Sequence, residues 1–528
     1  MSESQGKTLE YLVLGSGLAS LTFSALMAKK GHSVTTLESH EFFGGYGHTF
    51  QEGEYKFNAH LHYVVGCGED GVVTTILKKL NLDKTVLFTK LDPVSYDRVF
   101  CDGQLFKLPY TLEKLQENMI AYDPSPESKQ AIFKFIHVLK LFNKVSQRFP
   151  RHFRHSYKLL PVLPSLFPLL KYKNATLQYF FDDCKLPALL QTFLAGQLLN
   201  YLSPPKKLSF FVWAALFMGY NKAAYYPIKH FEHVINALIE TIQKYQGKLF
   251  NNIKVVEFIK ENNSNNTIIG VKTQAVDPKT GIAFGPKQAL YAKNIICNFD
   301  PKQAAEMIGI DSFSKTLKKQ LDYDYCGSSF VLYAVVKGID LREFGFGSWN
   351  IWHCQNDLNK TFDLMHNEQD YSQPYFAMNS CSLHYGVDNS NCSKENHQIF
   401  QMLTVANYDY WANLKIRDRH TYNKKKTELF DQLLDIVEKN YVPNIRKHIV
   451  FKMTGTPTTN ERYVLAPKGG CYGVNLTPRN FQFSRKLGSD TSIKNFYFCC
   501  AASGCGGFTG AMMTGLSLYE KLSNDYLE

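Results

Sequence analysis

The sequence has no CxxC pair and no Cys/His spacing typical of zinc ligands, although it contains twelve cysteines among 528 residues. A structural zinc site is therefore not expected, and no metal ligand is predicted. The first residues, Met1–Glu10, lack the apolar run of a secretory signal. Without such a signal the thiols are expected to stay reduced, and we predict a cytoplasmic protein.

Acidic residues are missing from one long stretch. Between Lys134 and Lys173 there are nine lysines and arginines and no aspartate or glutamate, in a chain of net charge +12. The neighbouring apolar block Leu159–Leu170 is interrupted by prolines and is shorter than the roughly 20 residues of a spanning helix. A basic stretch beside such a block is typical of a segment that lies on an anionic membrane. Attraction to anionic lipid contributes about 1 kcal/mol of binding free energy per cation near the surface. A solvated helix face with a proline-rich loop is the structural alternative. Nucleic acid is disfavoured as a partner because aliphatic residues separate the cations.

The apolar and aromatic content excludes a disordered chain. Hydrophobic residues make up 45% of the sequence and aromatic residues 14%. At roughly 100–200 residues per domain, the length corresponds to about two to four domain equivalents. The composition therefore predicts a globular protein with a large core.

A dinucleotide-binding motif opens the chain. Apolar strands are predicted over Leu9–Leu14 and Ser33–Leu37, with a helix between them. The GxGxxS turn after the first strand permits a tight bend and close approach of a pyrophosphate to the helix N-terminus. Glu38 ends the second strand, where a carboxylate accepts hydrogen bonds from ribose hydroxyls. A dinucleotide is therefore predicted to contact Gly15, Ser16, Gly17, Leu18, Ala19, Ser20 and Glu38.

A second pair of glycines follows Glu38. Gly44-Gly45 continues the phosphate-facing backbone, an arrangement that resembles the FAD signature of glutathione-reductase-like flavoproteins. Near the C-terminus, FYFCCAASGCGGFTGAMMTG predicts a strand, a glycine loop and a helix start, which would add backbone amides near a flavin. FAD is therefore the predicted cofactor.

Several segments, in order along nearly the whole chain, resemble those of one family. GGYGHTF, FNAHLHYVVG, KAAYYP, NIICNFDP and GTPTTNERYVLAPKGGCYG are similar to segments of the phytoene desaturase, carotenoid isomerase and retinol saturase group of FAD enzymes, closest to the retinol saturases. The resemblance implies that Val255 helps the glycines and Glu38 to hold the adenosine and phosphates. It also implies that His48, His62 and Tyr63 lie near the flavin ring, and that the glycines closing over it are Gly506, Gly507 and Gly510.

The chain departs from the family pattern within these segments. An aspartate and several glycines of the pattern are replaced, and so is one acidic residue. These departures bear on substrate identity and flavin affinity and leave the predicted fold unchanged. The residues at the departing positions are Asn58, His60, Lys229, His230, Cys500 and Ala502.

The candidate catalytic residues are His62, Tyr63 and His60. The two histidines are two positions apart, so on a strand both side chains would face the same side. A histidine near a flavin can donate a proton or orient a substrate. Packing is the structural alternative for both, and a loop hydrogen bond is the alternative for His48.

Two aromatic segments supply candidate substrate contacts. The apolar run Leu208–Tyr220 fits a helical core as well as the wall of a polyene tunnel. The neighbouring tyrosine pair could line the same tunnel. The candidates are Trp213, Tyr225 and Tyr226. The cysteines near the C-terminus, Cys499, Cys500 and Cys505, are predicted to be inert packing residues.

The predicted fold class is α/β (α+β), a glutathione-reductase-like Rossmann FAD-binding domain with an inserted mixed sheet and a helical domain. The FAD-binding domain is predicted to be discontinuous, formed by residues 8–111, 239–310 and 455–528. Residues 112–238 are the predicted helical insertion, which faces substrate and membrane. Residues 311–454 are the predicted mixed α/β substrate-binding region.

The predicted function is that of an FAD-dependent oxidoreductase, which saturates, desaturates or isomerises C–C bonds of a long apolar polyene such as a retinoid or carotenoid. Peripheral contact with a membrane is expected because such a lipid is nearly insoluble in water. The alternative is a non-catalytic lipid or prenyl carrier on the same fold, as in guanine-nucleotide dissociation inhibitors. An amine-oxidising flavoenzyme is disfavoured, because no aromatic cage for a cationic amine is recognisable.

Overall fold

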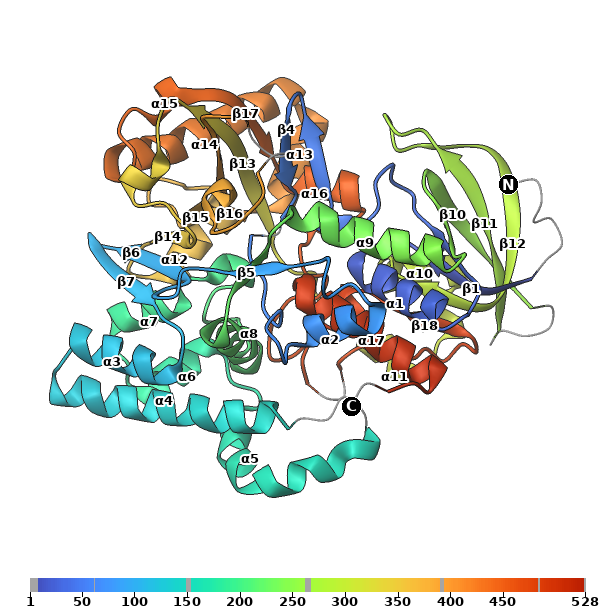
Figure 1. The fold of residues 1–528 in the computed structure, drawn as a ribbon, viewed down its shortest axis with the longest axis horizontal. Helices are drawn as coiled ribbons and strands as arrows, with labels where there is room; N and C mark the ends of the chain where they lie inside the picture. The colour runs from blue at the N-terminus through green and yellow to red at the C-terminus, as the bar shows by residue number, and fades with distance from the viewer. Residues whose placement is uncertain are drawn as a thin grey trace.

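Three parts surround a common centre in the computed structural model, which describes residues 8–60, 62–148, 153–261, 267–389, 394–482 and 485–526. A Rossmann-like part lies on the right of Figure 1, a second sheet at the upper left and a group of helices at the lower left. Within the described ranges no helix is both long and apolar enough to cross a membrane.

The Rossmann-like part is built on five parallel strands in the order β9-β2-β1-β12-β18. The predicted strand over 9–14 is present with the same bounds. Both faces of this sheet are covered, so all four residues of β2 and the last three of β12 are buried without alternation. The strands are β1 (Leu9–Leu14), β2 (Val34–Leu37), β9 (Lys248–Phe250), β12 (Ala283–Cys297) and β18 (Phe496–Phe498).

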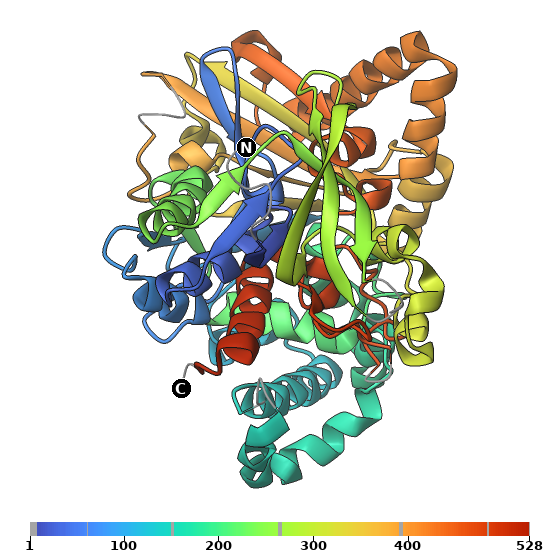
Figure 2. The ribbon, with the colours of Figure 1, turned by 90° about the vertical axis from the view of Figure 1, so that its right-hand side faces the viewer.

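The long strand β12 belongs to two layers. Its C-terminal end pairs in parallel with β1, and its N-terminal end pairs with β11 (Ile268–Val276) in an antiparallel meander completed by β10 (Ile253–Lys260). Figure 2 shows this meander standing beside the parallel sheet. The loop after β12 and the start of β10 therefore lie near the carboxyl ends of β1 and β2, where an open α/β sheet binds ligands.

Helix α1 (Leu18–Lys29) is buried around nearly its whole circumference. It contacts β2, α9 (His230–Lys244) and α17 (Gly507–Ser523). A Cβ atom on Gly515 of α17 would lie 2.2 Å from the Ala19 carbonyl oxygen, so glycine permits close packing of the two helices. The segments that begin and end the chain are thereby held side by side (Figure 1). Helix α2 (Val72–Leu80) also packs against α17.

The second sheet has seven strands in the order β17-β13-β16-β15-β14-β6-β7. Residues 97–108 had been allocated to the FAD-binding part, but they form β6 and β7, and β6 pairs in parallel with β14 of this sheet. Local sequence patterns do not reveal such a long-range pairing. The strands are β6 (Asp97–Cys101), β7 (Gln104–Leu108), β13 (Ser328–Lys337), β14 (Asn350–Cys354), β15 (Phe376–Asn379), β16 (His397–Ala406) and β17 (Ile449–Gly455).

Helices flank this sheet and the loops that join it to the Rossmann-like part. The helices after β12 are α10 (Pro301–Ile308), α11 (Lys315–Gln320), α12 (Leu358–Asp363), α13 (Tyr408–Arg417), α14 (Arg419–Asn440), α15 (Ile445–His448) and α16 (Pro457–Val464). The remaining strands form two small sheets, β3 (Thr49–Glu52) with β4 (Tyr55–Asn58) and β5 (Phe88–Lys90) with β8 (Tyr225–Pro227).

The predicted insertion 112–238 is mostly helical. Its last boundary falls inside α9, which packs on α1 and so belongs spatially to the Rossmann-like part. Aromatic side chains of α4, α6 and α8 pack together in its centre. The helices are α3 (Leu112–Tyr122), α4 (Pro126–Ser146), α5 (Leu163–Leu169), α6 (Leu177–Cys184), α7 (Ala188–Ala195) and α8 (Phe210–Lys222).

Candidate functional site

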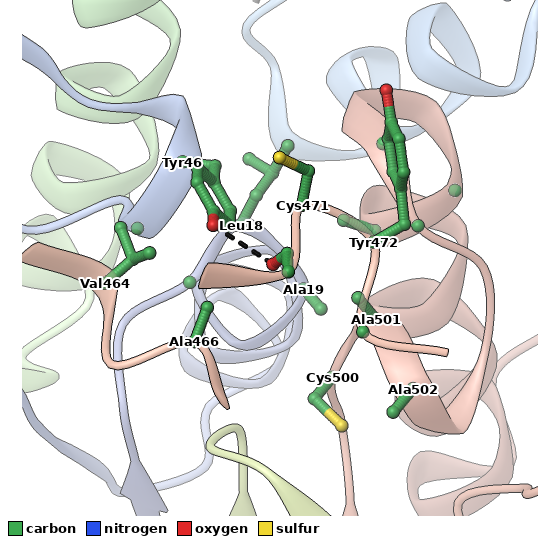
Figure 3. A pocket seen from close by; sticks show the side chains of 18 of the residues that line it. Leu18, Ala19, Tyr46, Val464, Ala466, Cys471, Tyr472, Cys500, Ala501 and Ala502 are labelled. Atoms are coloured by element: carbon green, nitrogen blue, oxygen red, sulfur yellow. Dashed lines mark hydrogen bonds between the residues drawn. The ribbon is translucent and has the colours of Figure 1, made fainter. Parts of the chain in front are cut away.

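One cavity of about 1250 Å³ lies where the three parts meet. The Rossmann-like part contributes the first glycine turn, the second sheet contributes Ser329 of β13 and Leu403 of β16, and the helical part contributes α8. Figure 3 shows part of its lining, with Leu18 and Ala19 of α1 facing the segment of Cys471 and Tyr472. This size is sufficient for a dinucleotide and leaves room for a second ligand, given that ligand pockets measure about 300–1,000 Å³.

The first glycine turn lies at one end of the cavity as predicted. Gly15 has a φ of +98°, which an L side chain rarely adopts. The backbone N–H of Gly17 donates to Asn298 Oδ1 over 2.8 Å, and a Cβ atom on Gly17 would lie 2.5 Å from that oxygen. Asn298 follows β12 directly and was not among the residues predicted to contact the dinucleotide. Its place in the NIICNFDP segment, which resembles the family pattern, could have indicated that Asn298 lies near the cofactor.

Glu38 lies beside this turn at the end of β2. Its carboxylate accepts hydrogen bonds from the Ser16 N–H at 2.8 Å and the Ser16 hydroxyl at 2.6 Å. The other carboxylate oxygen accepts from the His40 N–H at 2.9 Å. Glu38 also lines the cavity together with Val255 of β10, the two residues that the sequence assigns to the adenosine.

Two helix N-termini meet at the cavity without side-chain caps. Helix α1 starts after Gly17 and helix α17 starts after Gly506, and neither N-cap residue offers a side-chain acceptor to the first amides. An N-terminus carries roughly half a positive charge, and its free N–H groups suit a phosphate. Gly507 and Gly510 also line the cavity, so the C-terminal glycines lie where the sequence places them.

The predicted contacts of Ser16 and Ser20 are not direct. Both side chains are fully buried and lie outside the cavity lining. The Ser20 hydroxyl donates to the carbonyl oxygens of Gly15 at 2.7 Å and Gly17 at 2.9 Å, and Ser16 bonds to Glu38. These hydroxyls therefore hold the turn in shape.

The second glycine pair packs onto the first turn. The Gly44 N–H donates to the Ser16 carbonyl at 3.0 Å, and a Cβ atom on Gly45 would lie 3.4 Å from the Gly17 Cα. His48 bonds through Nδ1 to the Gly45 carbonyl at 2.6 Å and lies beside the His40 and Phe42 rings. His48 thus lines the cavity next to the loop that follows Glu38.

Tyr46 ties this loop to the segment that follows α16. Its hydroxyl donates to the Gly470 carbonyl over 3.0 Å, the contact dashed in Figure 3. The nearby cysteines form no disulfide: Cys471, Cys499, Cys500 and Cys505 are all free, and Cys471 and Cys500 do not face each other in Figure 3. Cys505 is exposed rather than packed inside.

His60 and His62 both line the cavity, on the turn that follows β4. His60 Nε2 lies 2.8 Å from Asn460 Oδ1, and His62 Nδ1 lies 3.0 Å from Asn379 Nδ2. Burial lowers the pKa of each ring to about 4. Both imidazoles are therefore neutral at pH 7.

Tyr63 belongs to a buried polar network that the sequence did not reveal. Its hydroxyl donates to Asp97 Oδ2 at 2.9 Å and accepts from Asn200 Nδ2 at 2.8 Å. Gln197 and Asn350 also donate to the Asp97 carboxylate. Burial is the larger influence and raises the Asp97 pKa to about 6, although the hydrogen bonds that the carboxylate accepts act in the opposite direction. No local motif marks these residues, because they come from separate strands and helices.

An apolar arm of the cavity runs along α8. Phe211, Val212, Ala215 and Leu216 share one face of this helix through their i, i+4 spacing and line the arm. The predicted substrate contacts Trp213, Tyr225 and Tyr226 do not line it. The helix is apolar on several faces, so the sequence could not indicate which face borders the cavity.

Trp213 lies on the opposite face of α8 and is fully buried. Its ring packs against Phe181 and, in a stacked arrangement, against Phe217. We expect Trp213→Ala to lower the free energy of unfolding by about 3–5 kcal/mol, the usual cost of deleting a buried aromatic ring. Denaturant unfolding of the flavin-loaded protein measures this loss. In Trp213→Phe the turnover should stay close to that of the wild type. A large fall in turnover at unchanged stability would instead show that Trp213 contacts the substrate.

The fold and this cradle define a dinucleotide-binding protein of the Rossmann class. Residues 13–80 match the NAD(P)-binding Rossmann-like domain family. The all-trans-retinol 13,14-reductase of Danio rerio is 22% identical over 98% of this chain and 86% of its own length. Prolycopene isomerase 2, chloroplastic, of an Oncidium hybrid cultivar is 22% identical over 89% of this chain and 76% of its own. These relatives support a retinol saturase and carotenoid isomerase-like family, which confirms the resemblance found in the motifs.

Solved structures of low sequence identity share the fold. An oxidoreductase from Methanosarcina mazei has a TM-score of 0.63 at 13% identity, covering 97% of this chain and all of its own. Putrescine oxidase bound to putrescine has a TM-score of 0.62 at 12% identity, covering 98% of this chain. A Rab GDI from Plasmodium falciparum has a TM-score of 0.51 at 14% identity, covering 99% of this chain. The fold class predicted from the sequence is confirmed.

Proposed function

We propose that this chain is an FAD-dependent oxidoreductase that acts on C–C bonds of a long apolar polyene. The observation that carries the proposal is the single cavity that joins the dinucleotide cradle at Gly17 to the apolar arm along α8. Relatives named as a retinol reductase and a prolycopene isomerase support a polyene C–C bond as the point of reaction.

The residues of the cradle fit FAD. Two uncapped helix N-termini can neutralise a pyrophosphate, Glu38 can accept from ribose hydroxyls, and Val255 on the cavity wall would contact the adenine. FAD supplies hydride transfer at a C–C bond when it is bound. The chain itself supplies the apolar wall of Phe211, Val212 and Leu216, which orients an extended lipid and excludes water.

The experiment compares cofactor and activity on one preparation. The purified full-length protein should be yellow and should release FAD on denaturation. Incubation with all-trans-retinol, and separately with a poly-cis carotene, each with dithionite as the two-electron donor that reduces the flavin, should yield a product changed at a C–C bond. A colourless protein that FAD cannot reconstitute, yet that copurifies with lipid, would instead identify a carrier on the same fold.

We infer that the lipid enters from a membrane beside α5. Leu160, Phe167 and Leu170 leave 65%, 66% and 48% of their surface exposed there. Lys173, a few residues further on, lines the cavity. These exposed apolar side chains therefore lie next to the cavity in sequence and carry the case for a docking surface.

The cations of the predicted basic stretch are partly neutralised. Lys134 and Lys171 pair with Asp183, and Lys140 pairs with Glu113. Among the remaining cations, Lys144, Arg148 and Lys173 are exposed. Arg151 lies outside the described residues, and the side chains of Arg154 and Lys158 are not described. Apolar insertion is therefore expected to contribute more to membrane binding than charge.

We expect serine at Leu160, Phe167 and Leu170 together to weaken binding to anionic vesicles by at least about tenfold, because each inserted side chain contributes about 1.5–3 kcal/mol when fully buried. Flotation with vesicles of phosphatidylserine and phosphatidylcholine measures the binding. The matched control places serine at Ile282, Phe284 and Tyr291, three exposed apolar residues of the distant meander. If both variants float with the vesicles as well as the wild type does, the exposed side chains beside α5 are not a membrane-docking surface.

A further inference from the structure

Asn200 places a polar side chain on the cavity wall beside α8. It belongs to the short 3₁₀ turn η4 (Leu198–Asn200), is half-buried and lines the cavity. The residues around it are more deeply buried: Leu199 and Tyr201 are at most 2% exposed, and Tyr63, which it contacts, is 5% exposed. The surface that Asn200 leaves accessible therefore faces the cavity.

The network around Asp97 determines which way the Asn200 amide points. The Asp97 carboxylate accepts from Asn350 Nδ2 and from the Tyr63 hydroxyl, each at 2.9 Å. Burial raises its pKa to about 6, so at pH 7 the carboxylate is mostly ionised and can only accept. The Tyr63 proton therefore points to Asp97, and the Tyr63 oxygen accepts from Asn200 Nδ2 at 2.8 Å.

The carbonyl oxygen of the Asn200 side chain is left without a donor. The reverse orientation of the amide would bring two oxygen atoms together, so Oδ1 is the amide atom that turns away from Tyr63. No described residue donates to Oδ1, and this oxygen keeps accessible surface, unlike the unpaired atoms that are fully buried. A molecule bound in the cavity can therefore reach it.

Asn200 lies toward the inner end of the apolar arm. The ring of its partner Tyr63 stacks on Tyr220 near the end of α8, with the ring centroids 4.2 Å apart. The start of α8 packs against the segment that follows Lys173. Phe211 and Tyr220 are separated by roughly 14 Å along the helix axis. An extended chain that enters beside Lys173 thus brings its leading end to Asn200.

Water can pair with this oxygen while solvent fills the arm, but a lipid that fills the arm displaces that water. The oxygen then stays unpaired, at a cost in binding free energy, unless the lipid itself donates a hydrogen bond. We propose that Asn200 is a specificity-determining residue whose Oδ1 accepts from the hydroxyl group of a polyene alcohol, so that the arm selects the alcohol over the hydrocarbon of the same chain. The inference rests on the proposed function for the polyene and assigns the polar group that the polyene carries.

Two probes that differ only at the hydroxyl group test this assignment: all-trans-retinol and the hydrocarbon in which a hydrogen atom replaces that group. Quenching of tryptophan fluorescence measures each Kd in detergent micelles without a reductant, and each value is corrected for partition of the probe into the micelles. We expect the wild type to bind the alcohol at least about tenfold more tightly, equivalent to about 1.4 kcal/mol. Equal affinity for the two probes would overturn the proposal even if no variant folds.

Variants at the two ends of α8 locate the contact. In Asn200→Leu the ratio of the two Kd values should fall to about one, because leucine is of similar size and offers no acceptor. Ser209→Ala is the matched control: it removes a polar side chain of the cavity wall at the start of α8 and should keep the preference for the alcohol. An unchanged ratio in Asn200→Leu would overturn the proposal. Loss of the preference in Ser209→Ala alone would also overturn it, because the hydroxyl group would then bind near the mouth of the arm.

The failure of this proposal is distinguishable from the failure of the proposed function. The ratio of Kd values is measured without turnover, so equal binding of the two probes by an active, flavin-loaded enzyme overturns the specificity alone. A colourless protein that still prefers the alcohol would count against the oxidoreductase and would leave the role of Asn200 in place.

Discussion

Gly17→Val is expected to abolish FAD binding while the chain stays folded. The new Cβ atom would approach Asn298 Oδ1, which is only 2.5 Å from its ideal position, and its methyl groups would occupy the place of the pyrophosphate. Loss of one charge-assisted contact to a phosphate is worth about 1.5–3 kcal/mol. Steric exclusion of the pyrophosphate by the valine methyl groups adds to this loss, so we expect at least about 100-fold weaker binding, equivalent to about 2.8 kcal/mol. Fluorescence titration of flavin-free protein with FAD measures the affinity.

The thermal stability of the same variant separates binding from folding. Added FAD should raise the Tm of the wild type, because ligand at 100 times its Kd stabilises the folded state by about 2.7 kcal/mol. The Tm of Gly17→Val should not change on addition of FAD. Gly488→Val is the matched control, because Gly488 is exposed and a Cβ atom there meets nothing within 4 Å. Full flavin content in Gly17→Val would show that the phosphates bind elsewhere.

Ala215→Trp is expected to block the apolar arm without loss of the cofactor. Ala215 lines the arm between Phe211 and Leu216, and an indole ring in its place would fill space that the lipid must occupy. We expect kcat/KM for a long polyene to fall by about 100-fold or more, since overfilled sites cost several kcal/mol when the occupant cannot rearrange. Flavin content per chain should remain at the wild-type value.

Steady-state kinetics with polyenes of two lengths tests the direction of the arm. The shorter substrate should lose less activity than the longer one, because it extends less far along α8. Lys222→Trp is the matched control on the same helix, at an exposed residue outside the cavity lining. Unchanged kcat/KM for the long substrate in Ala215→Trp would place the lipid in another part of the cavity.

The cofactor cradle was predictable because its chemistry is local. Gly15, Gly17, Glu38 and the pair Gly44-Gly45 lie within about thirty consecutive positions of one βαβ unit, and their spacing follows from backbone geometry alone. The helix starts and the strands of this unit were also found close to their predicted positions. A short sequence therefore suffices to predict a dinucleotide site of this class.

The remainder of the site depends on contacts between distant segments. Asp97, Asn350 and Asn379 become neighbours only because β6, β14 and β15 pair within one sheet. Asn298 meets Gly17 across a similar distance in sequence. Isolated polar residues in apolar strands carry no local signal of their partners.

The sequence by itself predicted FAD as the cofactor, and it determined the resemblance to polyene-modifying flavoenzymes and the helical nature of the insertion. Only the tertiary structure decided that α8 turns Ala215, and not Trp213, toward the cavity, and that His62 is coupled to Asp97 through two asparagines. The physical reason is the same in both cases. An apolar helix can bury any face, and a polar side chain can accept any partner, until the packing of the other elements leaves one arrangement that satisfies both.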